Sequence, residues 1–257
     1  MKPVIEDVRD RMNARYLAAA PGSTYETGLI FDAMRFRELD RAVLSLAWNE
    51  AHDRCLQALD VGSGEGGIAA YWPHQNVYGL ELSAVAVARA RERFPDATFE
   101  VGAIEEWDPR IAGRARSFRL VVARETIEHW VDVPRGLENL RRALTDGAVL
   151  VITTPNRDSL HCRIGKKLGR YVPKCCDEHQ REFGYEELQR LLRQHGFAVE
   201  QSRGVGLAPY WALEDVLGDD VRHLTDYDAD VNSWLNDIGR WMPAEYAFIQ
   251  CHRARAV

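Results

Sequence analysis

A short apolar run that breaks into alternating glycines constrains the fold of this chain more than any other feature. Residues 58–61 include Asp60 and are followed by Gly62, Gly64 and Gly66 at every second position. The run predicts a buried strand, and the glycines predict a turn too tight to hold side chains. At the end of a parallel strand, the backbone N–H groups of such a turn can contact a bound ligand. The chain is therefore expected to build a parallel sheet with a ligand site at this turn.

Two nucleoside cofactors fit the glycine turn that begins at Gly62. With Gly67 as the last glycine the turn matches G-x-G-x-x-G, the dinucleotide pattern. With Gly66 as the last glycine and Asp60 ahead of the turn, it matches the G-x-G-x-G pattern of S-adenosylmethionine (SAM) binding. Glu81 ends the next apolar run, where the ribose of either cofactor needs a carboxylate to accept from its hydroxyls. The glycines alone leave both cofactors open.

Composition limits the class of protein. The chain has 257 residues, 46% of them hydrophobic, enough for one large α/β domain with a substantial core. Its net charge of −6 argues against a general nucleic-acid partner. The charged residues 1–15 carry no apolar signal region, and no apolar run is long enough to span a membrane. Together with five scattered cysteines, which indicate reduced thiols, these features predict a cytoplasmic protein.

Strand-like and helix-like runs alternate after the glycine turn, which predicts a parallel sheet covered by helices on both faces. Helices are predicted at 84–94, where Ser83 provides the N-cap, at 137–144 with an end near Gly147, and at 188–192. Strands are predicted at 58–61, 77–80, 98–101, 118–123, 148–152, 197–199 and 246–249.

Two segments fall outside this alternation. Residues 1–52 form a predicted N-terminal helical segment or lid, in which one helix has an apolar face of Phe36, Leu39, Val43 and Leu46. Residues 53–257 form the main domain, within which 209–243 is too long for a hairpin and is predicted to be a small helical cap over the acceptor pocket. Tyr25 and Phe31 are expected to close that pocket from the other side.

The order and spacing of several motifs resolve the choice of cofactor. The run 120–129 contains the pair Glu128-His129, Thr154-Pro155-Asn156 follows a later strand, and His179 precedes a helix closed by Gly196. From about residue 55 to 205 this chain resembles the class I SAM-dependent methyltransferases, in the group with a Glu-His pair after the fourth strand. The resemblance implies an α/β, Rossmann-like fold with a seven-stranded sheet in the order 3-2-1-4-5-7-6 and an antiparallel last strand.

The resemblance also implies roles for individual residues in SAM binding. Glu81 would accept from the ribose hydroxyls, and Leu82, Ala103 and Ile104 would contact the adenine. Many relatives have an acid where Ala103 stands, which accepts from the adenine amino group. In this chain that bond is absent or is made by a neighbour such as Glu105. The residues expected along the methionine and ribose part are Asp60, Gly62, Ser63, Gly64, Gly66 and the backbone of Arg124.

The chemistry is expected at the carboxyl edge of the sheet. A hydroxyl acceptor must lose its proton during methyl transfer, and His129, with Glu128 beside it, is the predicted general base. A divalent metal such as Mg²⁺ is the other route to the same end, since it lowers the pKa of a bound hydroxyl. Its predicted ligands are Glu125, Glu128, His129 and His179.

The resemblance therefore predicts an O-methyltransferase that uses SAM on a small-molecule acceptor, such as a natural product, a quinone precursor or a sugar. Two alternatives stay open. One is an RNA 3′-terminal 2′-O-methyltransferase, which the metal-like motif and the basic run 163–174 support and the net charge opposes. The other is a SAM-binding module without catalysis. The sequence leaves the oligomeric state and the methylated atom open.

Overall fold

The computed structural model describes residues 4–18, 30–47, 56–170, 178–207, 238 and 241–257. Within these ranges no helix has both the length and the apolarity needed to cross a membrane. The strands are β1 Ala58–Val61, β2 Val77–Glu81, β3 Thr98–Val101, β4 Phe118–Arg124, β5 Leu144–Pro155, β6 Phe197–Val205 and β7 Ile249–Ala256. The α-helices are α1 Ile5–Ala18, α2 Ile30–Leu46, α4 Ala84–Arg93, α5 Val133–Ala143, α6 Leu160–Lys167 and α7 Tyr185–Gln194. The 3₁₀ turns are η1 Ile68–Ala70, η2 His74–Asn76 and η3 Ile127–His129.

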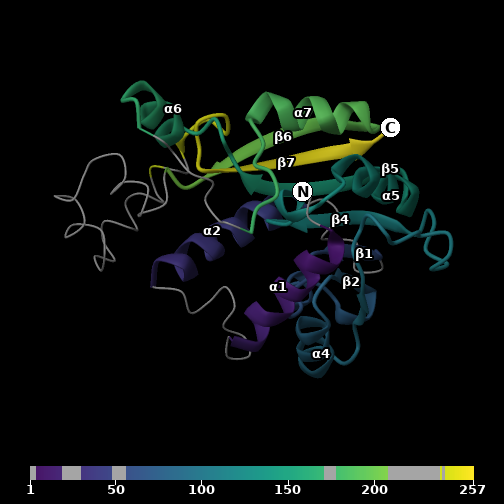
Figure 1. Cartoon of the computed structure of the whole chain (residues 1–257). Helices are drawn as coiled ribbons and strands as arrows, with labels where there is room; N and C mark the ends of the chain where they lie inside the picture. The colour runs from purple at the N-terminus through teal and green to yellow at the C-terminus, as the bar shows by residue number, and fades with distance from the viewer. Residues whose placement is uncertain (1–3, 19–29, 48–55, 171–177, 208–237, 239–240) are drawn as a thin grey trace.

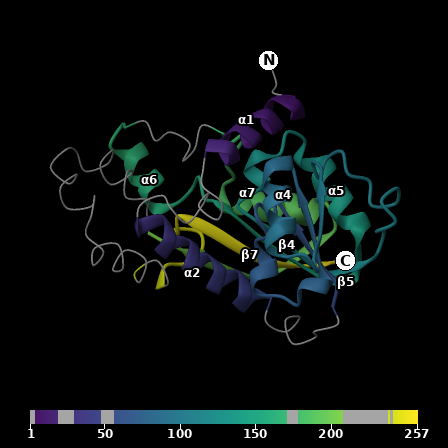
Figure 2. The same ribbon diagram turned by 90° about the horizontal axis from the view of Figure 1, so that it is seen from below.

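All seven strands form one sheet in the order β3-β2-β1-β4-β5-β7-β6. The strands β1 to β5 run parallel, and β7 pairs antiparallel with both β5 and β6. Figures 1 and 2 show the sheet from two directions, with helices on both of its faces. The predicted Rossmann-like sheet order and its antiparallel last strand are confirmed.

The sheet carries a separate apolar core on each face, because side chains along a strand alternate between faces. On β4, Val121 lies in one core and Val122 in the other. The first core is covered by α5 and α7, and the second by α2 and α4. Strands buried on both faces read as continuous apolar runs, which is why β4 and β5 were recognisable in the sequence.

Local sequence signals set several element ends. Ser83 caps α4 as predicted, and its Oγ accepts from the backbone N–H of Ala86 at 3.2 Å. Asp132 caps α5 and accepts from Arg135 N–H at 3.1 Å. The end of α5 differs from the prediction, since the helix stops at Ala143 and β5 begins at once.

The predicted position of the last strand is wrong. The apolar run 246–249 is mostly turn, and β7 begins at Ile249 and continues through the charged residues near the C-terminus. The polar run forms a strand because β7 lies between β5 and β6, where both edges find backbone partners. Its arginines also find a partner, since Arg253 and Arg255 both form ion pairs with Glu200 on β6. Tertiary pairing therefore overrides local hydrophobicity here.

The described part of the N-terminal segment packs on the main domain. Leu39, Val43 and Leu46 of α2 are buried as predicted, and Arg253 Nη1 donates to Leu46 O at 2.6 Å, at the end of this helix. The side chains of Tyr25, Phe31 and Phe36 lie outside the described residues. The same holds for the predicted cap 209–243, apart from residues 238 and 241–243.

His252 on β7 is expected to make the fold sensitive to acid. Its ring is fully buried between Ser202 Oγ at 2.8 Å and Gln250 Oε1 at 3.0 Å, and burial lowers its pKa to about 4. The unfolded chain takes up this proton near pH 6.5, so the stabilisation present above that pH is lost as pH falls toward 4. Between pH 7 and pH 4.5, we expect the free energy of unfolding of the wild type to fall by about 2 to 3 kcal/mol more than that of His252→Gln. Urea unfolding at each pH measures this, and parallel pH profiles for the two proteins would contradict it.

Candidate cofactor and catalytic site

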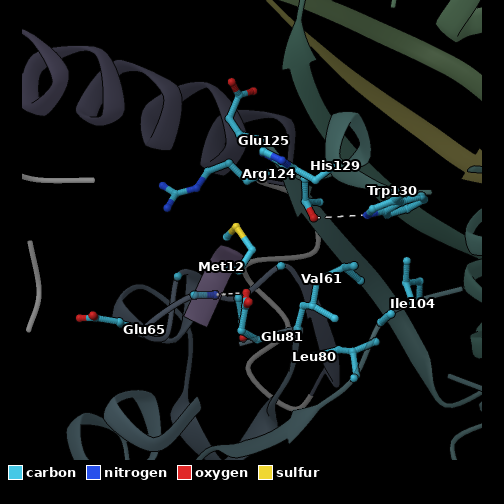
Figure 3. A pocket seen from close by; sticks show the side chains of 18 of the residues that line it. Met12, Val61, Glu65, Leu80, Glu81, Ile104, Arg124, Glu125, His129 and Trp130 are labelled. Carbon is cyan, nitrogen blue, oxygen red and sulfur yellow. Dashed lines mark hydrogen bonds between the residues drawn. The ribbon is translucent and has the colours of Figure 1, made fainter. Parts of the chain in front are cut away.

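A pocket opens at the carboxyl ends of β1, β2 and β4, and residues of α1, among them Met12, also line it (Figure 3). Parallel α/β sheets bind ligands at this edge, where the strand ends and their loops converge. Of the ten predicted cofactor residues, Asp60 is outside the lining and the other nine are part of it: Gly62, Ser63, Gly64, Gly66, Glu81, Leu82, Ala103, Ile104 and Arg124.

The glycine turn has a backbone that other residues would not adopt. Gly62, Gly64 and Gly66 have φ angles of 70°, 52° and 107°, in the left-handed region that favours glycine. A Cβ added to Gly62 would lie 2.5 Å from Thr126 Oγ1, and one added to Gly66 would lie 2.5 Å from the Phe94 ring. Both conformation and space therefore require glycine, and the turn presents bare backbone to the pocket.

Asp60 holds the turn from behind. Its carboxylate is 2% exposed and accepts from Ile68 N–H at 2.9 Å, which ties β1 to the first residue of η1. Burial raises the pKa of Asp60 to about 6, the nearby Arg124 lowers it, and Asp40 raises it. Asp60 thus shapes the turn, and its pKa depends on two charged residues that line the pocket.

Glu81 and Ser63 both have hydrogen-bonding capacity that their contacts within the described protein do not use. Glu81 accepts from Gly64 N–H at 3.0 Å and from Ser83 N–H at 2.8 Å, and burial raises its pKa. A carboxylate has about four acceptor sites, so capacity for ribose hydroxyls remains. In the described part of the chain, the buried Ser63 Oγ has no hydrogen-bond partner. An unsatisfied buried hydroxyl beside a glycine turn fits a site completed by a polar ligand.

The far end of the pocket is largely apolar, as an adenine requires. Ala103 and Ile104 are 5% and 3% exposed. Asn139 on α5 holds their loop, because its Nδ2 donates to Ile104 O at 2.8 Å and to Glu105 O at 3.2 Å. Glu105 also lines the pocket, and its carboxylate accepts from Val131 N–H at 2.8 Å; its bond to an adenine stays a prediction.

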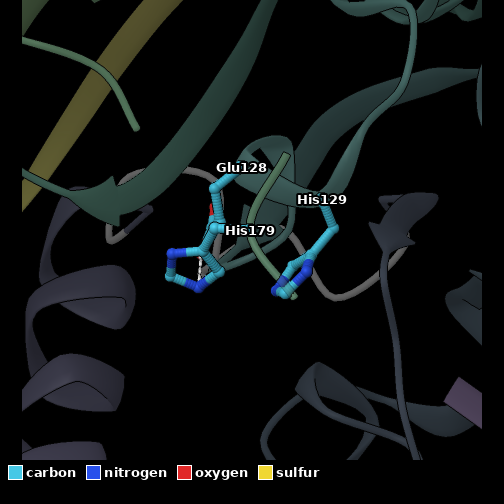
Figure 4. A group of neighbouring side chains, drawn as sticks. All are labelled: Glu128, His129 and His179. Carbon is cyan, nitrogen blue, oxygen red and sulfur yellow. Dashed lines mark ion pairs between the residues drawn. The ribbon is translucent and has the colours of Figure 1, made fainter. Parts of the chain in front are cut away.

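Glu128, His129 and His179 form a cluster beside the pocket (Figure 4). One ligand atom from each lies within 4.8 Å of the others. Each histidine is oriented through Nδ1, which contacts Glu178 O at 3.3 Å in His129 and Glu182 Oε1 at 2.9 Å in His179. If both Nδ1 atoms donate in these contacts, each Nε2 keeps its lone pair.

Burial shapes the charge of this cluster. Glu128 is 1% exposed, and desolvation, followed by the nearby charge of Glu125, raises its pKa well above the ordinary value. Desolvation and the neighbouring His179 lower the pKa of His129 to about 4, so its imidazole is neutral at pH 7. A neutral imidazole and a buried carboxyl group can take up a proton or coordinate a cation.

Glu125, the fourth predicted metal ligand, lies outside the cluster. It has a left-handed backbone, with φ of 49°, and its Oε1 accepts from Thr153 Oγ1 at 2.8 Å. It lines the cofactor pocket instead. A left-handed non-glycine residue stores strain of the kind that concentrates at functional sites.

The N-terminal helices contribute pocket residues that the sequence reading did not assign. On α1, Ile5, Val8, Met12 and Tyr16 line the pocket, and their spacing of three and four residues is the signal that could have identified them. The other unassigned residues include Asp40 on α2 and Tyr71 after η1. These two carry no local pattern, because the fold brings them together from distant parts of the chain.

The sequence matches known methyltransferases. A family model described as "Methyltransferase domain" matches residues 31–202. A probable SAM-dependent methyltransferase of Mycolicibacterium smegmatis is 33% identical over 149 residues, which cover 57% of this chain and 54% of the relative. A ubiquinone biosynthesis O-methyltransferase of a Bradyrhizobium species is 26% identical over 171 residues, covering 62% of this chain and 66% of the relative. The chain thus spans about half to two thirds of the length of these curated relatives.

A solved structure shares the fold over nearly the whole chain. The magnesium protoporphyrin IX methyltransferase of Synechocystis PCC 6803 superimposes with a TM-score of 0.60 at 14% identity, covering 98% of this chain and 99% of that one. At this identity the likeness concerns the fold alone. Since the family model matches well over half of the chain, the protein belongs to the class I SAM-dependent methyltransferases.

Proposed function

We propose that the protein binds SAM in the pocket at the glycine turn and transfers its methyl group to a hydroxyl of a small molecule. The family takes its methyl group from SAM. In this proposal the ribose bonds to Glu81, the adenine lies against Leu82, Ala103 and Ile104, and the methionyl part follows the turn. The unsatisfied Ser63 Oγ and the glycine backbone support this arrangement.

The position of His129 is the observation that favours a hydroxyl as the methyl acceptor. Its ring lines the cofactor pocket and packs edge-on against His179, with ring centroids 4.9 Å apart. SAM supplies an activated methyl group on sulfur. His129 Nε2 takes the hydroxyl proton, and the contact of its Nδ1 with Glu178 O favours the imidazolium that forms. Methyl transfer to an amine that is already neutral would not need such a base.

A divalent metal is a second route to the same proton loss, with Glu128, His129 and His179 as its ligands. Their separation and the anchoring of both histidines through Nδ1 support it. Dialysis against EDTA followed by Mg²⁺ or Mn²⁺ tests this route. Activity that falls with EDTA and returns with the metal favours it, whereas full activity after EDTA leaves His129 to act alone.

Glu81→Gln is expected to weaken the binding of the product S-adenosylhomocysteine (SAH) by about 10- to 100-fold. A glutamine has one acceptor oxygen, so its amide would meet one of the backbone N–H groups of Gly64 and Ser83, and it loses charge toward the ribose. Isothermal titration calorimetry measures the change. Glu92→Gln, at an exposed acid of α4, is the control and should bind like the wild type.

A labelled-methyl assay over several acceptor classes tests the function itself. The panel holds catechols and other phenols, sugars and a short RNA, because the name of the Bradyrhizobium relative favours a quinone precursor. We expect methyl transfer to oxygen of a small molecule. RNA methylation whose binding weakens steeply with salt would favour the RNA alternative. SAH binding without transfer to any acceptor would favour a non-catalytic module, and failure to bind SAH would overturn the proposal.

A further inference from the structure

Three side chains form a charged group at one end of the cofactor pocket. Arg124 Nη1 donates to Asp40 Oδ1, and the Tyr71 hydroxyl donates to Asp40 Oδ2 at 2.8 Å. They come from the end of β4, from α2 and from the residue after η1, and all three line the pocket. The side chains of Arg124 and Asp40 are only 24% and 18% exposed, so solvent screens this pair less than a surface pair.

The two ends of the pocket have opposite character. Figure 3 shows Arg124 on the other side of the pocket from the apolar Ile104. The pocket lining holds other charged residues, and each has contacts of its own. Glu65 pairs with Arg89 at 2.9 Å, the exposed Arg93 lies over the Phe94 ring, and Glu125 accepts from Thr153 Oγ1 at 2.8 Å. Glu81 and Glu105 accept from backbone N–H groups. A half-buried cation and anion side by side are therefore the distinguishing feature of the end away from Ile104.

We propose that this end binds the amino-acid head group of SAM, with Arg124 on the α-carboxylate and Asp40 on the α-ammonium. The inference rests on the proposed SAM-binding function and specifies which residues bind the two charged groups of the head group. It assigns a binding role to Asp40, which lies on α2 and outside the glycine turn. The guanidinium of Arg124, beyond its expected backbone role, becomes a binding group as well.

The bonding capacity of the group allows this without breaking its internal contacts. Arg124 has five N–H donors and Asp40 about four acceptor sites, whereas the contacts described above use one donor and two acceptor sites. A zwitterion placed beside the pair completes an alternating ring of two positive and two negative charges. The charges would be matched, so the half-buried site gains attraction without an unpaired ion.

The competing explanation is that the pair only fastens α2 to the sheet. Two ligands separate the two roles: SAH carries the zwitterionic head group, and 5′-methylthioadenosine carries the same nucleoside without it. A head-group site changes the affinity for SAH alone. A fastening role changes both affinities together, because it acts through the shape of the whole pocket.

Calorimetric titration of both ligands into wild type, Asp40→Asn and Arg124→Gln tests the inference. We expect each variant to weaken SAH binding by about 10- to 100-fold, since hydrogen bonds to charged groups contribute about 1.5–3 kcal/mol. The affinity for 5′-methylthioadenosine should change less than about 3-fold. The ratio of SAH affinity to 5′-methylthioadenosine affinity should therefore fall steeply in both variants. Arg110→Gln breaks the Arg110–Asp108 pair, which is not part of the pocket lining, and should leave both affinities unchanged.

The outcomes are separable. Equal losses for SAH and 5′-methylthioadenosine, or unchanged SAH affinity in both variants, would overturn the head-group assignment. A wild-type protein that binds neither ligand would overturn the proposed function instead. Thermal unfolding of each variant identifies a misfolded one, and two variants on separate elements keep the test decisive if either fails to fold.

Discussion

Gly62→Ala is expected to weaken SAH binding by about 100-fold or more, the largest binding effect among the glycine-turn residues. The new Cβ would lie 2.5 Å from Thr126 Oγ1 and 2.7 Å from Thr126 Cβ, and a β-branched side chain cannot rotate both atoms away. The turn and the loop after β4 must therefore separate. Because both line the cofactor pocket, the backbone contacts that SAM needs would be lost.

Gly113→Ala is the matched control for this substitution. Gly113 has a φ of 67°, close to the 70° of Gly62, but a Cβ there meets nothing within 4 Å. Both variants bear the same backbone strain of about 1–2 kcal/mol, and only one has the collision. We expect Gly113→Ala to be mildly destabilised and to bind SAH like the wild type. Equal SAH affinity in Gly62→Ala and Gly113→Ala would show that the collision does not reach the pocket.

His129→Ala is expected to lower kcat by about 10² to 10⁴-fold with an accepted hydroxyl substrate, the usual range for loss of a general base. The reason is that His129 supplies the neutral imidazole that lines the cofactor pocket. SAH affinity should change by less than about 3-fold, because the ribose and adenine contacts are untouched. Single-turnover kinetics with labelled SAM separate the chemical step from binding.

His195→Ala is the control, since His195 is a partly buried histidine at the end of α7 and is not part of the pocket lining. It should keep the wild-type kcat. A His129→Ala enzyme within about 3-fold of wild-type kcat would remove His129 from the role of base. The metal route would then account for the proton loss only if EDTA abolishes activity.

Much of the fold could be predicted because it depends on local patterns. β1, β2 and β4 are short apolar runs, and the N-cap at Ser83 is a side-chain signal that acts within its own helix. The full strand order came from the resemblance to a family. β7 could not be placed, since Arg253 and Arg255 become strand residues only through partners on β6 that lie far away in the sequence.

The candidate site, too, could be predicted from the sequence only in part. The sequence identified the glycine turn, Glu81 and the Glu128–His129 pair, because each follows a recognisable strand end. It grouped Glu125 with the metal ligands on helical spacing, whereas a left-handed backbone and a bond to Thr153 place that carboxylate elsewhere. Asp40 was not identified, since only the packing of α2 against the sheet brings it to Arg124.

The junction of β6 and β7 has a consequence for how such a protein could diversify. Val205 and Ile249 are paired neighbours in the sheet, so the connection between β6 and β7 begins and ends at one point. The entropy of closing a connection grows only slowly with its length. An exchanged connection would still have to keep residues 244–248, because Ala247 and Phe248 are buried and Asn156 Nδ2 donates to the carbonyl oxygens of residues 244, 245 and 247. A change in the length of the connection would then leave the pairing of β6 with β7 unchanged.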